Sequence, residues 1–454
     1  MNLQPIRTFI HRERPAFLGL AAVTAVCAAV LGVVLALGDQ RTFEIVASNP
    51  GEGRTVSSTA NSISLTFSNE ARRDAVEESF RVDPPVNGVP RWRGQTFEYI
   101  LREPLEPGAY TVSLDAGTLG RGSERLRTDF SMTFEVRAPG IAVVESLGDE
   151  GERLVEVRAD DTRELARGLR ILDYEISPDS SRLAVIVESE PEQSRLELVD
   201  IDTGERQVVV DDPDVDVATV SWAADSQALL AVRRDTLPDG GQGVPRAWLL
   251  RLSGEFVSPI DPDGEPTLAP RWSPDAQMIM YSAPATGRLV VLNLGTQEER
   301  NLGQPRSSAF VWSPDSSKVA FEGVPDTVGS QPIQPIRVQS LDGELDLVIG
   351  DEGESHSLPR FLDDDVVMGL RRNIGEDSSG TDLLFHSVED ANLLRAIELT
   401  PGADLVLDWD LAPTRQEVVY TVQAGNSIST IVLDLETGQR EPVEPAGRRA
   451  SWIP

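Results

Sequence analysis

At 454 residues the chain is longer than one ordinary domain, so two or three domains are expected. Its formal net charge of -33 at pH 7 argues against a nucleic-acid partner, because the phosphate backbone would be repelled. The single cysteine, Cys27, excludes an internal disulfide framework, and three histidines leave little material for a histidine-based metal site or triad.

An uncharged segment, residues 16–38, lies near the N-terminus. As a helix it would rise about 34 Å, enough to cross a hydrocarbon core of about 30 Å. Arg7, Arg12 and Arg14 precede it, so the positive-inside rule places residues 1–15 in the cytoplasm as a short tail and the rest of the chain outside. Signal-peptide cores usually span only about 7–15 residues, so we expect an uncleaved single-pass anchor in the cell membrane, with a cleaved signal as the alternative.

Residues 43–137 show the period-two alternation of half-buried strands, as in Ile63, Leu65 and Phe67. Similar alternation follows at residues 97–101, 110–114 and 130–136, which predicts two antiparallel sheets packed face to face. The stretches ISLTFSNEA, LEPGAYTVSL and DFSMTFEV resemble the bacterial immunoglobulin-like domains of surface proteins. That resemblance implies a spacer, or alternatively an adhesion module, because fold alone does not fix function.

A bulky residue followed by a Ser-Pro-Asp-like turn recurs through the last two thirds of the chain. The copies begin at Ile176, Trp222, Trp272, Trp312, Phe361 and Leu411, the last two being weaker. A period of about 45 residues is typical of a β-propeller with four strands in each blade. Pro presets φ in such a turn, and Asp or Ser can bind its free backbone N–H groups, so we interpret the motif as structural.

The recurring WSPD pattern, with an apolar strand on either side, resembles the TolB-type propeller repeat over residues 141–454. Three strands with no first strand before them are expected at residues 141–146, 153–161 and 162–169. Trp452 matches the bulky position of a first strand. We therefore expect the C-terminal strand to complete the first blade, whose other three strands come from residues 141–169 (three-plus-one closure). The ectodomain would then be all-β, with a seven-bladed propeller; six or eight blades are the alternatives. Closure would remove exposed sheet edges.

In this topology the Ser-Pro-Asp turns, which join the first strand of a blade to the second, share one face of the propeller with the tight hairpins that join the third strand to the fourth. The long connections, which run from the second strand to the third and from one blade to the next, leave from the opposite face. Loops on a rigid scaffold are where binding usually resides, so we expect the long-loop face to bind a protein or cell-envelope partner, with a cationic one favoured. Ordinary solvated loops are the alternative. The candidate residues are Asp211, Asp212, Asp214, Arg233, Arg234, Asp261, Asp263, Asp351, Glu352, Arg371 and Arg372. No cofactor is expected; calcium at residues 261–264 is a weaker alternative, since no Glu completes the loop.

No catalytic motif stands out in the sequence. TolB-type repeats also resemble the propellers attached to prolyl-oligopeptidase-like hydrolases, but the GxSxG elbow of such hydrolases is missing. His356 lies between two serines in an expected loop, and His386 lies in an expected third strand. We therefore expect a membrane-anchored binding or scaffold protein without enzyme activity. The alternative is a propeller-based lyase or hydrolase of a cell-envelope polymer, which converging His, Arg and carboxylate groups at the central channel would favour.

Overall fold

The computed structural model describes residues 43–454, except residues 61, 122–123, 160, 192, 262–263, 329–330, 352, 374–379 and 403. The expected tail (1–15) and apolar span (16–38) lie outside these residues. No helix within the described part is long and apolar enough to cross a membrane. The chain divides into two compact units: a smaller one up to Arg54 with residues 62–102 and 110–134, and a larger one with residues 55–61, 103–109 and 135–454.

The smaller unit is built on two four-stranded antiparallel sheets, in the orders β1-β3-β6-β5 and β2-β8-β7-β4. Its elements are β1 (Ile45–Asn49), β2 (Arg54–Val56), β3 (Ser62–Phe67), α3 (Arg73–Ser79), β4 (Phe80–Asp83), β5 (Gly88–Arg93), β6 (Thr96–Leu101), β7 (Gly108–Leu114) and β8 (Phe130–Val136). Residues 55–56 of β2, 108–109 of β7 and 135–136 of β8 belong to the larger unit. The expected alternation is confirmed in β3, where Ile63, Leu65 and Phe67 are buried. Rings stack within this core, with centroids 5.1 Å apart for Phe43 and Phe67.

The larger unit contains seven four-stranded antiparallel sheets among its described residues. The first is β11-β10-β9-β38, made of β9 (Gly140–Ser146), β10 (Glu152–Arg158), β11 (Asp161–Gly168) and β38 (Arg448–Ile453), with the short helix η1 (Gly148–Glu150) between β9 and β10. The second contains β12 (Arg170–Ile176), β13 (Arg182–Glu190), β14 (Gln193–Asp200) and β15 (Arg206–Val210). The third contains β16 (Val215–Trp222), β17 (Ala228–Asp235), β18 (Arg246–Arg251) and β19 (Phe256–Pro259).

Four further sheets follow in chain order. The fourth contains β20 (Leu268–Trp272), β21 (Met278–Ala283), β22 (Arg288–Asn293) and β23 (Glu299–Asn301). The fifth contains β24 (Pro305–Trp312), β25 (Lys318–Gly323), β28 (Ile336–Ser340) and β29 (Asp346–Ile349), with the separate hairpin β26 (Asp326–Val328) and β27 (Gln331–Ile333) inserted. The sixth contains β30 (Glu354–Phe361), β31 (Val366–Asn373), β32 (Thr381–Ser387) and β33 (Leu393–Thr400). The seventh contains β34 (Leu405–Leu411), β35 (Glu417–Ala424), β36 (Ser427–Asp434) and β37 (Arg440–Val443).

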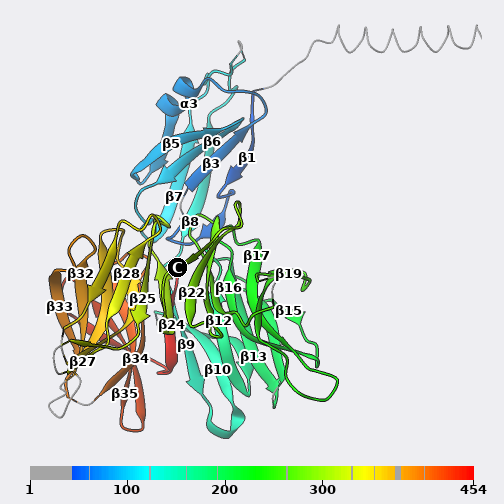
Figure 1. Ribbon diagram of the computed structural model, residues 1–454. Helices are drawn as coiled ribbons and strands as arrows, with labels where there is room; N and C mark the ends of the chain where they lie inside the picture. Colours follow the sequence, from blue (N-terminus) through cyan, green and yellow to red (C-terminus); the bar gives the residue numbers. More distant parts are fainter. Residues whose placement is uncertain are drawn as a thin grey trace, which may run out of the picture. The chain divides into compact units, whose positions relative to one another are not determined.

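Strand β38 links the two ends of this series of sheets. It pairs with β9 through Trp452 and Ile141, and in Figure 1 the red C-terminal strand runs beside β9. Apolar clusters fill the space between neighbouring sheets, and one of them joins Val419 and Val443 of the seventh sheet to Val143 and Trp452 of the first. The sheets therefore form a closed series, because burial of these side chains holds the last sheet against the first.

The Ser-Pro-Asp turns have the structural role expected from the sequence. In the turn after β24, Ser313 Oγ donates to Asp315 Oδ1 at 2.6 Å, and the same carboxylate oxygen accepts from the N–H of Ser317 at 2.9 Å. Ser316, which lies between Asp315 and Ser317, has a φ of 64°. Burial pushes the pKa of Asp315 upward, but the hydrogen bonds from Ser313 and Ser317 outweigh it and hold this pKa below its usual range.

These turns also connect neighbouring sheets, which the sequence did not reveal. The N–H of Asp179 donates to Ser226 Oγ in the next turn along the chain at 3.1 Å. The N–H of Asp275 does the same to Ser316 Oγ at 3.1 Å, and in the weaker fifth copy Asp364 accepts from Asp315 N at 2.9 Å. The repeated motif therefore shapes each turn and also binds it to its neighbour.

Replacing Asp315 by alanine is expected to lower the free energy of unfolding by about 1–2 kcal/mol, because the N–H of Ser317 and two hydroxyl groups lose their acceptor. Urea denaturation measures this loss. Glu344→Ala, at an exposed carboxylate in the β28–β29 turn, is the control and is expected to change stability by no more than about 0.5 kcal/mol. Equal losses for the two variants would contradict the capping role.

Candidate functional site

The long connections of the larger unit leave from one end of its sheets. Neighbouring strands are antiparallel, so the connection from second to third strand shares an end with the connection to the next sheet. The connections from the second strand to the third include residues 236–245 and 324–335. The connections to the next sheet include residues 211–214 and 350–353. We call these four segments the long-loop face. The opposite end, which carries the Ser-Pro-Asp turns and the tight hairpins, is the short-turn face.

Three of the predicted site residues form an exposed acidic group on the long-loop face. Asp211, Asp212 and Asp214 are all exposed between β15 and β16. Asp212 Oδ1 accepts from the N–H of Asp214 at 3.0 Å, which fixes the local turn. None of the three makes an ion pair with a residue that the structure describes, so their charges face solvent.

The predicted arginines beside this acidic group are already paired. Arg233 binds Asp235 at 2.6 Å, and Arg234 lies 3.5 Å from Asp216 and donates to Gln242 at 2.7 Å. Asp261 follows β19, the last strand of the same sheet, and its carbonyl accepts from Arg246 at 2.5 Å. This part of the long-loop face is therefore acidic overall, because the cations are neutralised locally and the three aspartates are not.

Two aromatic side chains that were not predicted as site residues lie beside the guanidinium of Arg233. Its guanidinium carbon is 5.3 Å from the ring centroid of Trp248 and 4.7 Å from that of Phe256. Both distances are within the range of cation–π attraction. The signal was hidden because Trp248 and Phe256 belong to different strands of a hairpin, β18 and β19.

A second group of predicted residues belongs to the sixth sheet. Arg371 binds Asp382 at 2.6 Å and Glu354 at 3.3 Å, and Arg372 pairs in register with Ser355. Asp351 is exposed just before β30. Asp263 and Glu352 lie outside the described residues. The candidates therefore fall into two separate groups, one on the third sheet and one on the sixth.

His356 was expected in a connecting loop, but it lies in β30 and is buried. Burial lowers its pKa, while the hydrogen bond to Glu354, 2.9 Å from Nε2, acts in the opposite direction. His386 lies in β32, the third strand of its sheet as predicted, and its Nδ1 is 3.0 Å from the carbonyl oxygen of Ala391. Neither imidazole hydrogen-bonds a serine among the described residues, so no triad geometry is present there.

Carboxylates and arginines converge on the first strands of the sheets. Asp408 accepts from the N–H groups of Arg449 at 2.8 Å and Ala450 at 3.2 Å, and Asp410 accepts from that of Trp452 at 3.0 Å. Burial raises the pKa of both aspartates. These carboxylates bind the backbone of β38, so they hold one sheet to the next rather than standing free for acid–base chemistry.

The same arrangement joins the second sheet to the third. Asp173 accepts from Val220 N at 3.0 Å, and Glu175 accepts from Trp222 N at 3.2 Å. Burial raises the pKa of Glu175 to about 7, although nearby Arg271 and the N–H of Trp222 favour its charged form. A carboxyl group with such a pKa can exchange a proton near neutrality, but its oxygen is engaged by the neighbouring strand.

No protein-family model matches this sequence, and no curated protein matches it. The chain is similar in structure to TolB from Acinetobacter baumannii, with a TM-score of 0.44 and 14% identity over 83% of each chain. It is also similar to oligogalacturonate lyase from Vibrio parahaemolyticus, with a TM-score of 0.49 and 14% identity over 66% of this chain and 88% of the lyase. A prolyl endopeptidase gives 0.48 and 12%, over 84% of this chain and 52% of the endopeptidase, about half its length. At these values the similarities carry no conclusion about activity, ligand or partner.

Proposed function

We propose that this protein is a binding or scaffold protein that recruits a protein or cell-envelope partner through the long-loop face. The partner surface is cationic. The observation that carries this proposal is the exposed group of Asp211, Asp212 and Asp214, whose charges have no ion-pair partner among the described residues. Complementary charge speeds the encounter of two surfaces and selects the partner.

The proposal includes the architecture in which this face is presented. Residues 141–454 form a seven-bladed TolB-type propeller with three-plus-one closure, and residues 43–137 form an immunoglobulin-like spacer. The pairing of β38 with β9 and the two four-stranded sheets of the smaller unit support these assignments. The uncharged run at residues 16–38 anchors the chain in the cell membrane, with the bulk of the protein outside the cytoplasm.

The competing proposal, a lyase or hydrolase, has less support from the geometry. Its expected signature was a group of converging His, Arg and carboxylate residues at the central channel. Asp408, Asp410 and Asp173 instead accept backbone N–H groups of neighbouring strands. We therefore propose that the protein is not an enzyme and needs no cofactor.

The recruitment proposal is tested by reversing charge on the long-loop face. Asp211→Lys/Asp214→Lys leaves Asp212, which stabilises the local turn, in place. Crosslinking of the full-length protein in its native membrane, followed by identification of captured proteins, is expected to show at least a tenfold loss of the main partner, because attraction becomes repulsion.

The matched control is Glu344→Lys/Glu436→Lys, which makes the same charge change at exposed positions in tight hairpins of the short-turn face. This control is expected to retain capture. Unchanged capture by Asp211→Lys/Asp214→Lys, or equal losses for both double variants, would refute recruitment through the long-loop face.

A further inference from the structure

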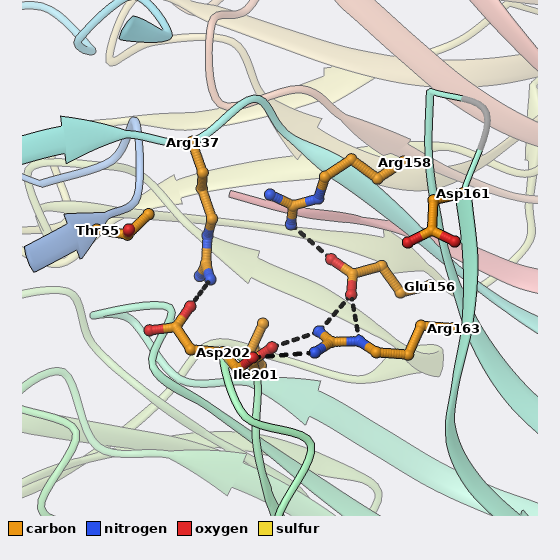
Figure 2. Close-up of a pocket in the computed structure, with 8 residues that line it drawn as sticks. All are labelled: Thr55, Arg137, Glu156, Arg158, Asp161, Arg163, Ile201 and Asp202. Atoms are coloured by element: carbon orange, nitrogen blue, oxygen red, sulfur yellow. Dashed lines mark hydrogen bonds and ion pairs between the residues drawn. The ribbon is translucent and has the colours of Figure 1, made fainter. Parts of the chain in front are cut away.

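Three arginines gather around a cavity on the short-turn face, between the first and second sheets. The cavity has a volume of about 260 Å³ and is lined by Arg137, Arg158 and Arg163 together with Glu156, Asp161, Asp202, Ile201 and Thr55. Figure 2 shows the three guanidinium groups and the carboxylates of Glu156 and Asp202 facing this space. We call it the arginine pocket. It is unexpected in a chain with 74 acidic and 41 basic residues.

The carboxylates of the arginine pocket are shared unequally among its three guanidinium groups. Glu156 is only 5% exposed, and its two carboxylate oxygens are shared between Arg158 and Arg163, each at 2.5 Å. Asp202 pairs with Arg137 at 2.6 Å. Two carboxylates, those of Glu156 and of the 53% exposed Asp202, therefore pair with three guanidinium groups, and the third acid, Asp161, is exposed and makes no ion pair among the described residues. Burial lowers the pKa of Arg137, the charges of Arg158 and Arg163 act in the same direction, and those of Asp202 and Glu156 oppose them.

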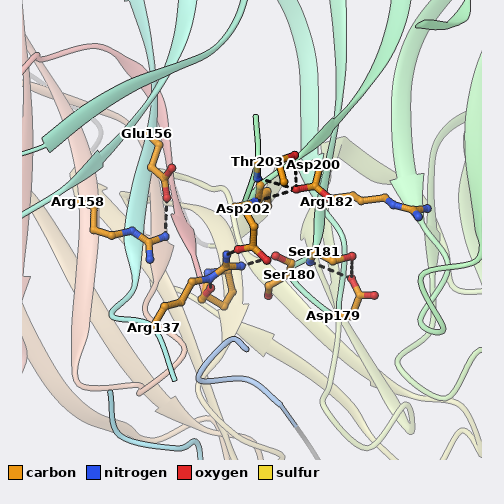
Figure 3. Close-up of polar contacts among 12 residues, drawn as sticks. Arg137, Glu156, Arg158, Asp179, Ser180, Ser181, Arg182, Asp200, Asp202 and Thr203 are labelled. Carbon is orange, nitrogen blue, oxygen red and sulfur yellow. Dashed lines mark hydrogen bonds and ion pairs between the residues drawn. The ribbon is translucent and has the colours of Figure 1, made fainter. Parts of the chain in front are cut away.

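Two of the three arginines also donate hydrogen bonds to backbone oxygens, which hold the fold together. Arg163 also donates to the carbonyl oxygens of Ile201 and, at 3.2 Å, Asp202. Arg137 donates to the carbonyl oxygen of Ser180 and, at 3.1 Å, to a backbone oxygen of Pro454, in addition to its ion pair with Asp202. Figure 3 shows Arg137 reaching Asp202 and Ser180 while Arg158 lies beside Glu156.

Arg158 differs from its two neighbours because its described hydrogen bond goes to Glu156 alone. A guanidinium carries five N–H donors in a planar fork, so most donors of Arg158 remain open toward the cavity. Its side chain is 27% exposed, which leaves it accessible from solvent. A planar oxyanion presents two acceptors to such a fork.

We propose that the arginine pocket binds one carboxylate group, with Arg158 as the main donor and Arg137 and Arg163 supplying positive potential. A single negative charge can share the fork of Arg158 with Glu156, whereas a phosphate dianion would meet stronger repulsion from Glu156, Asp202 and Asp161. The volume is below the range of about 300–1,000 Å³ typical of pockets for drug-sized ligands, so it accommodates one group of a larger molecule or a small free acid. This site is independent of the long-loop face, and the two proposals can fail separately.

Calorimetric titration of the full-length protein with sodium acetate, at constant ionic strength with chloride as the balancing anion, tests the proposal. Saturable binding in the millimolar range is expected, with inorganic phosphate binding more weakly. Arg158→Gln is expected to weaken acetate binding at least tenfold, and Arg158→Lys, which keeps the charge but loses the fork, by a smaller factor. The matched control is Arg167→Gln, at an arginine of β11 that pairs with Glu164 outside the pocket.

Unfolding curves without acetate show whether Arg158→Gln retains the fold. If it does not, acetate binding is compared between Arg158→Lys and the unaltered protein. A carboxylate-bearing peptide titrated in parallel with acetate distinguishes a macromolecular from a free source of the group. The proposal is overturned by non-saturable acetate binding, by phosphate binding more tightly than acetate, or by Arg158→Gln binding acetate as the unaltered protein does.

Discussion

Replacing Arg449 by alanine is expected to lower the free energy of unfolding of the larger unit by about 2–3 kcal/mol. Arg449 lies in β38 and forms an ion pair with Asp173, whose side chain is 11% exposed. It also donates to the carbonyl oxygen of Leu172 at 2.5 Å and lies 5.5 Å from the ring centroid of Tyr174. The variant leaves a buried carboxylate without its cation and removes a link between the first and second sheets.

Urea denaturation followed by tryptophan fluorescence measures this loss, because every tryptophan except Trp92 lies in the larger unit. Arg167→Ala is the matched control. Arg167 is 45% exposed and pairs with Glu164 within one strand, so its removal is expected to cost less than about 1 kcal/mol.

A double-mutant cycle with Asp173→Ala separates the ion pair from general damage to the strand. The two losses are expected to be non-additive, with a coupling energy of at least about 1 kcal/mol, since residues in contact share their interaction. Additive losses would show that Arg449 stabilises β38 in some other way than through Asp173.

The features that the sequence predicted correctly depend on residues that are close together in the chain. The Ser-Pro-Asp turns were predictable because Ser313, Asp315 and Ser317 bind one another within five residues. The tight hairpins were predictable for the same reason: Gly204 and Gly438, at the tips of two of them, both have a φ of 74°, a conformation that favours glycine. The exposed Asp211, Asp212 and Asp214 were likewise visible as a charged run between two strands.

Contacts between distant parts of the chain were not predictable in this way. Arg137 meets Asp202, and Arg449 meets Asp173, only because the sheets are brought together by folding. In the sequence these residues are ordinary charges in an acidic protein. The arginine pocket was missed for this reason, and the roles of Asp408 and Asp410 in holding β38 were missed as well.

Replacing Glu175 by glutamine is expected to stabilise the larger unit at neutral and alkaline pH but not in acid. Burial raises the pKa of this carboxyl from 4.5 to about 7 in the folded protein. Between these two values the folded state holds a proton that the unfolded state has lost. Stability therefore falls as the pH rises through this window, and the loss is complete above about pH 7.

Glutamine carries no charge to desolvate, and its side-chain oxygen can still accept from the N–H of Trp222, as Glu175 does at 3.2 Å. The stability difference between Glu175→Gln and the unaltered protein should therefore increase by about 2–3 kcal/mol from pH 4 to pH 8, since one pKa unit corresponds to about 1.4 kcal/mol and partial exposure reduces the full shift. Urea denaturation at a series of pH values measures it. Glu436→Gln, at an exposed carboxylate of the β36–β37 turn, should give a flat difference. A flat profile for Glu175→Gln as well would mean that Glu175 is solvated in the folded protein, and a falling profile would mean that Arg271 stabilises its charge more than burial opposes it.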